Sequence, residues 1–165
     1  HHNIQPLFSV FNRDSFDLAQ TFDLQAYKIA SRTVNEETEL VRDIIATGKQ
    51  VFISLGMTQE SKPFGIADSI IYLWCQSQYP VHPWELKDFP DSFELNQTLG
   101  FSDHSVGIEL ALIAIMRGAE VIEKHFTLDK SDVTIRDHAL SLTPDEFRQM
   151  VILGREIKKY YELGI

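Results

Sequence analysis

The sequence contains one cysteine, Cys75, among 165 residues, and few basic residues: 15 Lys and Arg against 24 Asp and Glu, a net charge of −9. A single cysteine cannot form an internal disulfide, and it fits a protein of the reducing cytoplasm. Without a basic stripe the chain lacks the electrostatic footprint of a nucleic-acid binder. No apolar run approaches the roughly 18 residues of a membrane span, and no signal peptide is visible. We therefore expect a cytoplasmic protein with neither nucleic acid nor membrane as partner.

Short apolar runs alternate with helix-like segments along the chain. The length predicts a single domain, residues 1–165, and 44% hydrophobic with 24% charged residues is typical of a globular protein. Strand–helix alternation predicts an α/β fold with a parallel sheet and right-handed crossovers. The six expected strands are Leu7–Phe11, Ala26–Ala30, Gln50–Ser54, Ile70–Cys75, Leu99–Phe101 and Val121–Phe126.

Capping residues predict where three of the helices begin. Asn35 is expected to cap a helix with glutamates in its first turn, and Ser105 a helix over Val106–Arg117. Thr143 begins a Thr-Pro-Asp-Glu capping box whose helix runs to about Tyr160. The connections 56–69 and 81–98 contain Pro and are predicted as loops with at most a short helix.

Two histidines, His104 and His125, each end an expected strand, and one helix-like segment separates them. Consecutive parallel strands joined by a helix usually lie side by side, and parallel α/β folds build their sites at strand C-termini. Two imidazoles there can converge on Mn²⁺, Fe²⁺, Co²⁺ or Zn²⁺. The alternative is that each histidine is a partly buried side chain satisfied by the protein itself.

Polar side chains recur at the ends of other expected strands. Ser31, Ser54 and Ser102 could cradle a phosphate or carboxylate with hydroxyl and backbone N–H groups, although any one of them could be an ordinary loop serine. Lys28 lies in an apolar strand, where a buried ammonium needs an anionic partner; a lysine extending to solvent at the strand edge is the alternative.

Three further residues could bind a sugar. Ser77 and Tyr79 follow the fourth strand and could hydrogen-bond a polyol, or Tyr79 could pack on the rim of a turn set by the following proline. Asp137 follows the last strand and could accept a hydrogen bond from a sugar hydroxyl, or it could be an exposed turn carboxylate.

Six motifs occur in one order: Lys28–Ser31, Ile53–Met57, Cys75–Pro80, Gly100–His104, Ile122–Thr127 and Asp137-His138. Together they closely resemble the N-acetylneuraminate (sialic acid) synthase family, which includes legionaminate, pseudaminate and spore-coat polysaccharide synthases. The resemblance covers nearly the whole chain. It implies a (β/α)8 barrel that condenses phosphoenolpyruvate with an N-acetylated hexose such as N-acetylmannosamine, releasing phosphate.

The resemblance also implies a role for each candidate residue. His104 and His125 match the family's metal ligands, with Mn²⁺ expected and Mg²⁺ or Co²⁺ as alternatives, and with Asp137 they match catalytic positions. Tyr79 and Asp137 match sugar-binding positions. The residues that match phosphoenolpyruvate-binding or adjacent pocket positions are Ser9, Lys28, Ser31, Ser54, Ser77 and Ser102.

Several features depart from the family pattern. The first two βα units and the C-terminal antifreeze-like domain have no counterpart in this sequence. Arg32-Thr33 stands where the family usually has Gly-Glu, and Ile135-Arg136 where it has Gly-Pro. We therefore expect a partial TIM (β/α)8-type barrel of about six parallel strands with crossover helices, two of them shortened.

Three readings of function follow from this pattern. The first is a sialic acid synthase-like enzyme whose isolated chain has weak or no activity. The second is a degenerate, non-catalytic barrel that binds a metal or acts as a partner subunit, and the third is another metal-dependent aldolase-type barrel. Because an open parallel edge favours pairing, a homo-oligomer such as a dimer is also expected.

Overall fold

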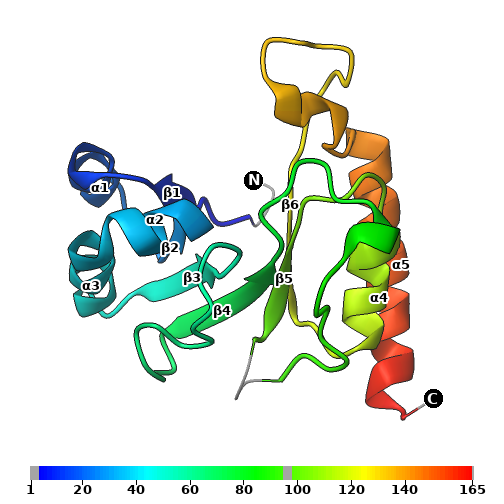
Figure 1. The fold of residues 1–165 in the computed structure, drawn as a ribbon, viewed down its shortest axis with the longest axis horizontal. Coiled ribbons are helices and arrows are strands. Elements are labelled where there is room, and N and C mark those ends of the chain that lie inside the picture. Colours follow the sequence, from blue (N-terminus) through cyan, green and yellow to red (C-terminus); the bar gives the residue numbers. More distant parts are fainter. Residues whose placement is uncertain (1–3, 95–97, 165) are drawn as a thin grey trace. The chain divides into compact units, whose positions relative to one another are not determined.

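The computed structural model describes residues 4–94 and 98–164. Its strands follow the chain order β1-β2-β3-β4-β5-β6 in the sheet (Figure 1). This confirms the predicted α/β fold. The strands are β1 Phe8–Val10, β2 Ala26–Ile29, β3 Gln50–Ser54, β4 Ile70–Cys75, β5 Gly100–Asp103 and β6 Val121–Lys124. The helices are α1 Arg13–Gln20, α2 Ser31–Glu36, α3 Thr38–Ala46, α4 Glu109–Met116 and α5 Pro144–Glu162, with short 3₁₀ turns at Pro83–Glu85 and Arg136–Ala139.

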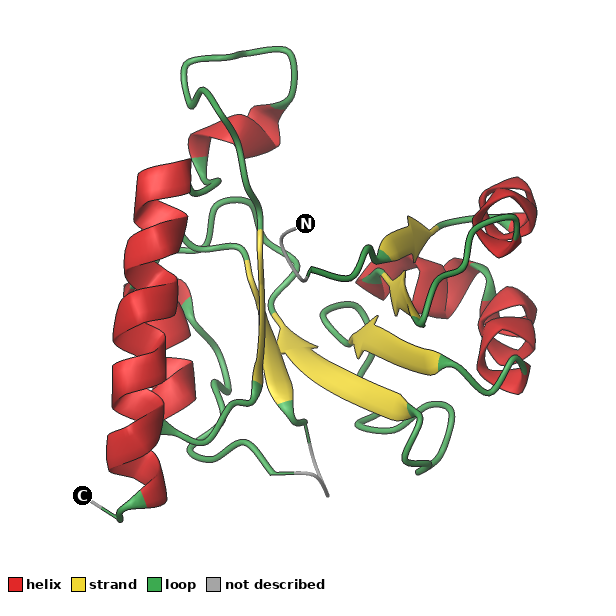
Figure 2. Cartoon of the chain, turned by 180° about the vertical axis from the view of Figure 1, so that it is seen from behind, coloured by secondary structure: helices red, strands yellow, loops and turns green. Residues whose placement is uncertain are grey.

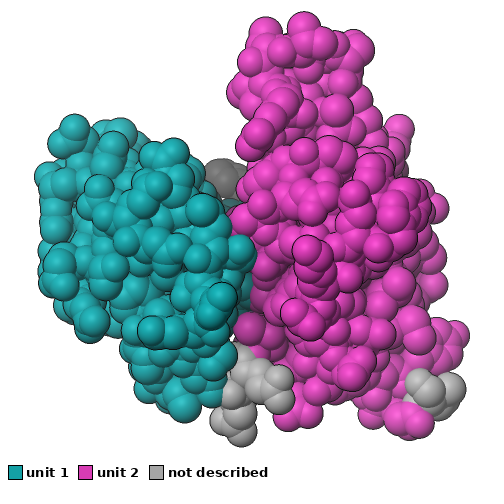
Figure 3. Space-filling view, viewed as in Figure 1, with its two compact units in different colours: residues 1–73 teal, residues 74–165 magenta. Residues whose placement is uncertain are grey.

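The chain forms two compact units, His1–Leu73 and Trp74–Ile165, coloured separately in Figure 3. In the first unit, β1, β2, β3 and the start of β4 pair in parallel. Helix α1 begins with a reciprocal capping box in which Asn12 and Ser15 satisfy each other's backbone N–H groups. The apolar faces of the strands and helices of this unit close one core, which includes Val10, Tyr27, Ile29, Leu40, Val41, Ile44, Val51 and Ile53.

The second unit contains the end of β4, the parallel pair β5–β6, and helices α4 and α5. Both helices lie against the same side of β5 and β6 (Figures 1 and 2). Two clusters form its core, one around Phe93, Phe101 and Ala114 and one around Ala111, Leu142 and Met150. The helices pack along the strands, and the residues at the carboxyl ends of β5 and β6 are polar.

Helix boundaries show where the capping predictions succeed and fail. Thr143 caps α5 with the predicted box. Asn35 lies inside α2 instead of capping a helix, because its amide donates to the carbonyl of Met57 (2.6 Å). Ser105 does not cap α4 either: the helix begins at Glu109, after Gly107 with φ of 82° has broken the helical path.

The segment 56–69 contains no helix, and 81–98 contains only the turn Pro83–Glu85 among its described residues; residues 95–97 lie outside them. For the described residues, this confirms the prediction that both connections are loops with at most a short helix. Across residues 4–94 and 98–164, no helix is both long and apolar enough to cross a membrane.

Candidate functional site

In the first unit, β2 and β3 place a lysine and a serine in contact. Lys28 is buried, and its Nζ donates to Ser54 Oγ and to the Ile29 carbonyl, each at 2.9 Å. Ser9 of β1 is in register with Lys28, so both belong to the same face of the sheet. The structure therefore shows the predicted burial of Lys28, and the hydrogen bonds of its ammonium include one to a hydroxyl and one to a backbone carbonyl.

Ser31 lies just beyond β2, as the first residue of α2. It is buried, and its Oγ accepts the backbone N–H of Gly56 at 2.9 Å, in the loop after β3. The four predicted residues of this unit thus follow three successive strands: Ser9 on β1, Lys28 and Ser31 at β2, and Ser54 at β3. An ammonium with nearby hydroxyls has the chemistry to hold an anion.

In the second unit, the histidine pair lies just beyond β5 and β6, as the sequence predicts. The ring centroids of His104 and His125 are 5.4 Å apart. Two residues earlier on each strand, Ser102 Oγ donates to Glu123 Oε2 at 2.5 Å. The period of two places all four side chains on one face of the sheet.

His104 has a defined tautomer. Its Nδ1 lies 3.0 Å from the carbonyl oxygen of Gln76, which can only accept, so Nδ1 carries the proton. Its Nε2 therefore presents a lone pair, which accepts the hydroxyl of Tyr79 at 2.9 Å. Burial lowers the pKa of His104 and so favours the neutral ring, the form that ligates metals.

Tyr79 packs against both histidines. Its ring stacks on His104 with centroids 4.1 Å apart and meets His125 edge-on at 5.9 Å. Burial, reinforced by nearby negative groups, raises the pKa of Tyr79 to about 12, which keeps the phenol protonated as a donor. The guanidinium of Arg136 lies over the Tyr79 ring, 5.0 Å from its centroid.

Asp137 lies in the turn after β6, beside His125. Its Oδ2 is 3.9 Å from His125 Nδ1, an ion-pair distance that is too long for a hydrogen bond. Its Oδ1 is buried and, within the described chain, accepts no hydrogen bond, although Arg136 Nε is 3.4 Å away. A buried carboxylate oxygen without a donor is suited to accept one from a ligand.

Ser77 is exposed in the loop after β4, and within the described residues it makes no hydrogen bond with either histidine. The Gln76 carbonyl and the Glu123 carboxylate contribute instead. The period of two along the strand places Glu123 on the same face as His125, so the sequence indicates its position. The Gln76 carbonyl has no sequence signal, because any residue supplies one.

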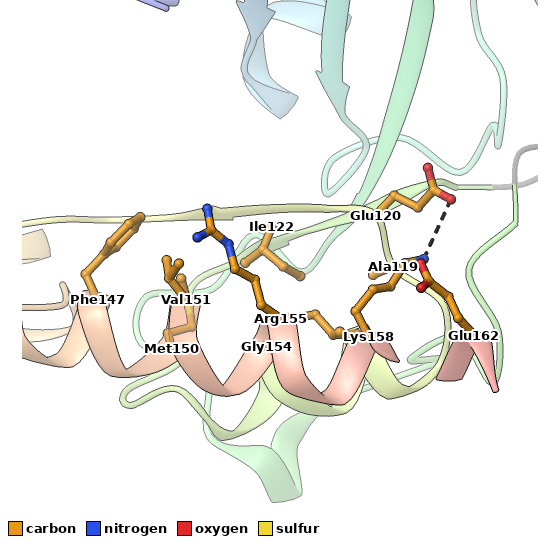
Figure 4. Close-up of a pocket in the computed structure, with 11 residues that line it drawn as sticks. Ala119, Glu120, Ile122, Phe147, Met150, Val151, Gly154, Arg155, Lys158 and Glu162 are labelled. Atoms are coloured by element: carbon orange, nitrogen blue, oxygen red, sulfur yellow. Dashed lines mark ion pairs between the residues drawn. The ribbon is translucent and has the colours of Figure 1, made fainter. Parts of the chain in front are cut away.

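A cavity of about 630 Å³ lies elsewhere in the second unit, where α5 faces α4 and β6 (Figure 4). Its lining combines apolar side chains, including Ile122, Met150 and Val151, with charged ones, of which Lys158 and Glu120 pair at 3.8 Å. None of the predicted site residues lines this cavity. The polar strand ends, and not the cavity, therefore form the candidate site.

The sequence matches the family described as the NeuB family over residues 1–164. It is 38% identical to a pseudaminic acid synthase of Campylobacter jejuni over 159 residues, covering 90% of this chain and 46% of that protein. It is 33% identical to an N,N'-diacetyllegionaminic acid synthase of Campylobacter jejuni, covering 99% of this chain and 52% of that protein. The chain thus spans about half the length of these curated relatives.

Solved structures give the same fold. The spore coat polysaccharide biosynthesis protein SpsE of Bacillus subtilis superposes with a TM-score of 0.82 at 27% identity, covering 98% of this chain and 48% of that one. The N-acetylneuraminic acid synthetase of Leptospira borgpetersenii superposes with a TM-score of 0.75 at 25% identity, covering 92% and 56%. The six-stranded α/β architecture therefore corresponds to part of a larger barrel domain.

Proposed function

Because this chain belongs to the NeuB family, we propose that it carries part of the active site of a nonulosonic acid synthase. The proposed reaction joins phosphoenolpyruvate to an N-acetylated hexose, such as N-acetylmannosamine, and releases phosphate. The named relatives are synthases of such acids, which supports the kind of reaction. The substrates and the metal are those that the resemblance to the sialic acid synthase family implies.

The observation that carries the proposal is the arrangement of His104. Its Nδ1 proton is fixed by a backbone carbonyl, its Nε2 lone pair is accessible to a donor, and its ring centroid lies 5.4 Å from that of His125. A backbone acceptor on the second nitrogen is the usual support of a metal-ligating histidine. Imidazole nitrogens lie about 2.1 Å from a bound divalent ion, so rings with centroids 5.4 Å apart can share one ion.

His104 and His125 would hold the metal, with Mn²⁺ expected and Mg²⁺ or Co²⁺ as alternatives. Among the described residues, no group of three or more His, Cys, Asp or Glu side chains is arranged for a metal, so water and substrate oxygens would complete the coordination. The chemistry that such an ion would supply when bound is Lewis-acid polarisation of the sugar aldehyde, which would favour its attack by the enol carbon of phosphoenolpyruvate.

The remaining residues bind and orient the substrates. The Lys28 ammonium, with the hydroxyls of Ser9, Ser31 and Ser54, supplies the charge-assisted hydrogen bonds that a phosphate or carboxylate requires. On the other unit, the buried Asp137 Oδ1 accepts a sugar hydroxyl, and the phenol of Tyr79 donates to a sugar oxygen. Ser102, held by Glu123, and the exposed Ser77 complete the set proposed for phosphoenolpyruvate.

The test separates metal binding from turnover. We expect the chain to bind Mn²⁺ in calorimetry, and His104→Ala and His125→Ala each to abolish it; unchanged titrations in both variants would refute the two-histidine site. Phosphate release from phosphoenolpyruvate, N-acetylmannosamine and Mn²⁺ should be weak or absent with this chain. A chimera that adds the remaining barrel segment of SpsE should release phosphate at a readily measured rate.

The competing function is a non-catalytic barrel that binds a metal or a partner chain. It is favoured by the departures from the family pattern at Arg32-Thr33 and Ile135-Arg136. Mn²⁺ binding without phosphate release in the chimera, over several N-acetylated hexoses, would select this alternative. A cytoplasmic location, expected from the single cysteine, completes the proposal.

A further inference from the structure

A buried polar cluster lies behind the two histidines, on residues that the proposed chemistry does not use. Asp103 and Lys124 directly precede His104 and His125, and they are register partners across β5 and β6. Because side chains alternate along a strand, both point away from the face shared by Ser102 and Glu123. The cluster therefore belongs to the opposite side of the same two strand ends.

The cluster is completely buried and densely hydrogen-bonded. Lys124 Nζ lies 2.8 Å from Asp103 Oδ2, with neither side chain exposed to solvent. The same ammonium donates to the Ser105 carbonyl at 2.5 Å and approaches Ser105 Oγ at 3.3 Å. Asp103 Oδ1 in turn accepts the Ser105 N–H at 2.7 Å. Residues 103 and 105, on both sides of His104, are thereby tied to the residue that precedes His125.

A buried ion pair seldom adds stability over well-packed apolar side chains, since removing two charges from water offsets their attraction. Its physical advantage is directional: an ammonium that must satisfy a carboxylate, a carbonyl and a hydroxyl allows only one alignment of the two strand ends. The neighbouring face needs such an alignment, because two rings that share an ion tolerate little displacement.

We propose that the Asp103–Lys124–Ser105 cluster is a positioning element that holds the ends of β5 and β6 in the alignment that makes His104 and His125 converge. The inference rests on the proposed two-histidine metal site. The three residues act through the backbone that they fix, and they touch neither metal nor substrate.

The decisive variant is Asp103→Leu/Lys124→Met, which replaces the ion pair by apolar side chains of similar volume. We expect the full chain to keep its far-UV circular dichroism and thermal midpoint. We expect its dissociation constant for Mn²⁺ to rise about tenfold, the scale seen when the support of a metal ligand is lost. Lys130→Met/Glu146→Gln, which breaks another ion pair of this unit, should leave Mn²⁺ affinity unchanged.

A second measurement needs no metal. In the wild-type chain, nuclear Overhauser contacts should join the rings of Tyr79 and His104, whose centroids are 4.1 Å apart, and those of His104 and His125. The double variant should weaken these contacts while the Lys130/Glu146 control keeps them. If the wild-type chain binds no Mn²⁺, the metal proposal fails, and the ring contacts still decide whether the cluster positions the histidines.

Unchanged Mn²⁺ affinity and unchanged ring contacts in a folded double variant would overturn the inference and leave the cluster a purely structural pair. Should the double variant fail to fold, Asp103→Asn replaces it, because the amide keeps the size of the side chain and an acceptor for Ser105. Several-fold weaker Mn²⁺ binding with broadened histidine ring signals would then support the positioning role. Wild-type values for both would refute it.

Discussion

The hydroxyl of Tyr79 occupies the His104 nitrogen that the proposed metal site requires. Its 2.9 Å hydrogen bond to Nε2 has to break before that lone pair can ligate an ion. We predict that Tyr79→Phe binds Mn²⁺ about two- to tenfold more tightly, which corresponds to the roughly 0.5–1.5 kcal/mol of one neutral hydrogen bond. Calorimetric titration with Mn²⁺ measures the change.

Tyr160→Phe is the matched control, since Tyr160 is exposed on α5 and the substitution removes the same hydroxyl. Its Mn²⁺ affinity should equal that of the wild-type chain. Weaker binding by Tyr79→Phe would show that the phenol assists the ion instead of competing with it.

Lys28 is the residue on which proposed anion binding depends most. Its buried ammonium donates to Ser54 Oγ and to the Ile29 carbonyl, and an ammonium can give charge-assisted hydrogen bonds to a phosphate or carboxylate. We predict that Lys28→Met weakens phosphoenolpyruvate binding about tenfold or more, since such bonds contribute about 1.5–3 kcal/mol each. Calorimetry compares it with Lys159→Met, an exposed lysine of α5, which should bind as the wild type does; equal affinities in the two variants would contradict the assignment.

Among the elements, α5 has the best-defined start. Glu146 Oε2 accepts the Thr143 N–H at 2.8 Å, and Glu146 Oε1 accepts Lys130 Nζ at 2.6 Å. The hydrogen bond from Lys130, with that from the Thr143 backbone, holds the pKa of Glu146 below its usual value of 4.5. The folded state therefore binds this proton more weakly than the unfolded state, and the stabilisation is present above pH 4.5 and lost as the pH falls through the folded-state pKa.

We predict that Glu146→Gln lowers the free energy of unfolding by about 1 kcal/mol at pH 7, the usual value of a helix cap. The loss should shrink as the pH falls through the lowered pKa of Glu146, where the wild-type carboxyl becomes protonated as well. Urea denaturation at pH 7 and at pH 3 measures the loss of unfolding free energy under each condition. An equal loss at pH 7 and pH 3 would mean that the charge of Glu146 makes no contribution.

The elements also show what the sequence can predict. Short apolar runs located the strands that the structure describes, and the local capping box of Thr143 identified the start of α5. The capping predictions for Asn35 and Ser105 were wrong because both residues have partners that are distant in sequence. The Asn35 amide donates to the Met57 carbonyl, and the Ser105 carbonyl accepts the Lys124 ammonium. Such partners are distant in sequence, and no local pattern encodes them.

The same limit applies to the candidate site. His104 and His125 could be paired from strand order alone, because parallel strands bring equivalent ends together. The tautomer of His104 could not be predicted from the sequence, since it depends on a backbone carbonyl that the loop after β4 contributes. The ion pair of Asp103 and Lys124 on the opposite face could not be predicted either, because a single sequence does not show which charges pair after burial.

On the scale of the molecule, the sheet order ends at β1 and β6 among the described residues. Edge strands of a parallel sheet present backbone groups that can pair with another chain. We therefore predict that the 19.0 kDa chain self-associates, with a mass that rises with concentration toward a dimer. Light scattering after size-exclusion chromatography measures this, and a constant monomer mass over a wide concentration range would refute it.

The two compact units have separate buried clusters. Ile53 belongs to the cluster of the first unit and Leu142 to one of the second, and both side chains are fully buried. Both tryptophans, Trp74 and Trp84, belong to the second unit, so fluorescence reports that unit while circular dichroism reports the whole chain.

Truncation of a buried Ile or Leu to Ala costs about 2–5 kcal/mol. We predict that Ile53→Ala lowers the urea midpoint seen by circular dichroism and leaves the fluorescence midpoint nearly unchanged, whereas Leu142→Ala lowers the fluorescence midpoint. Coincident transitions that move together in both variants would show instead that the strands couple the two cores into one cooperative structure.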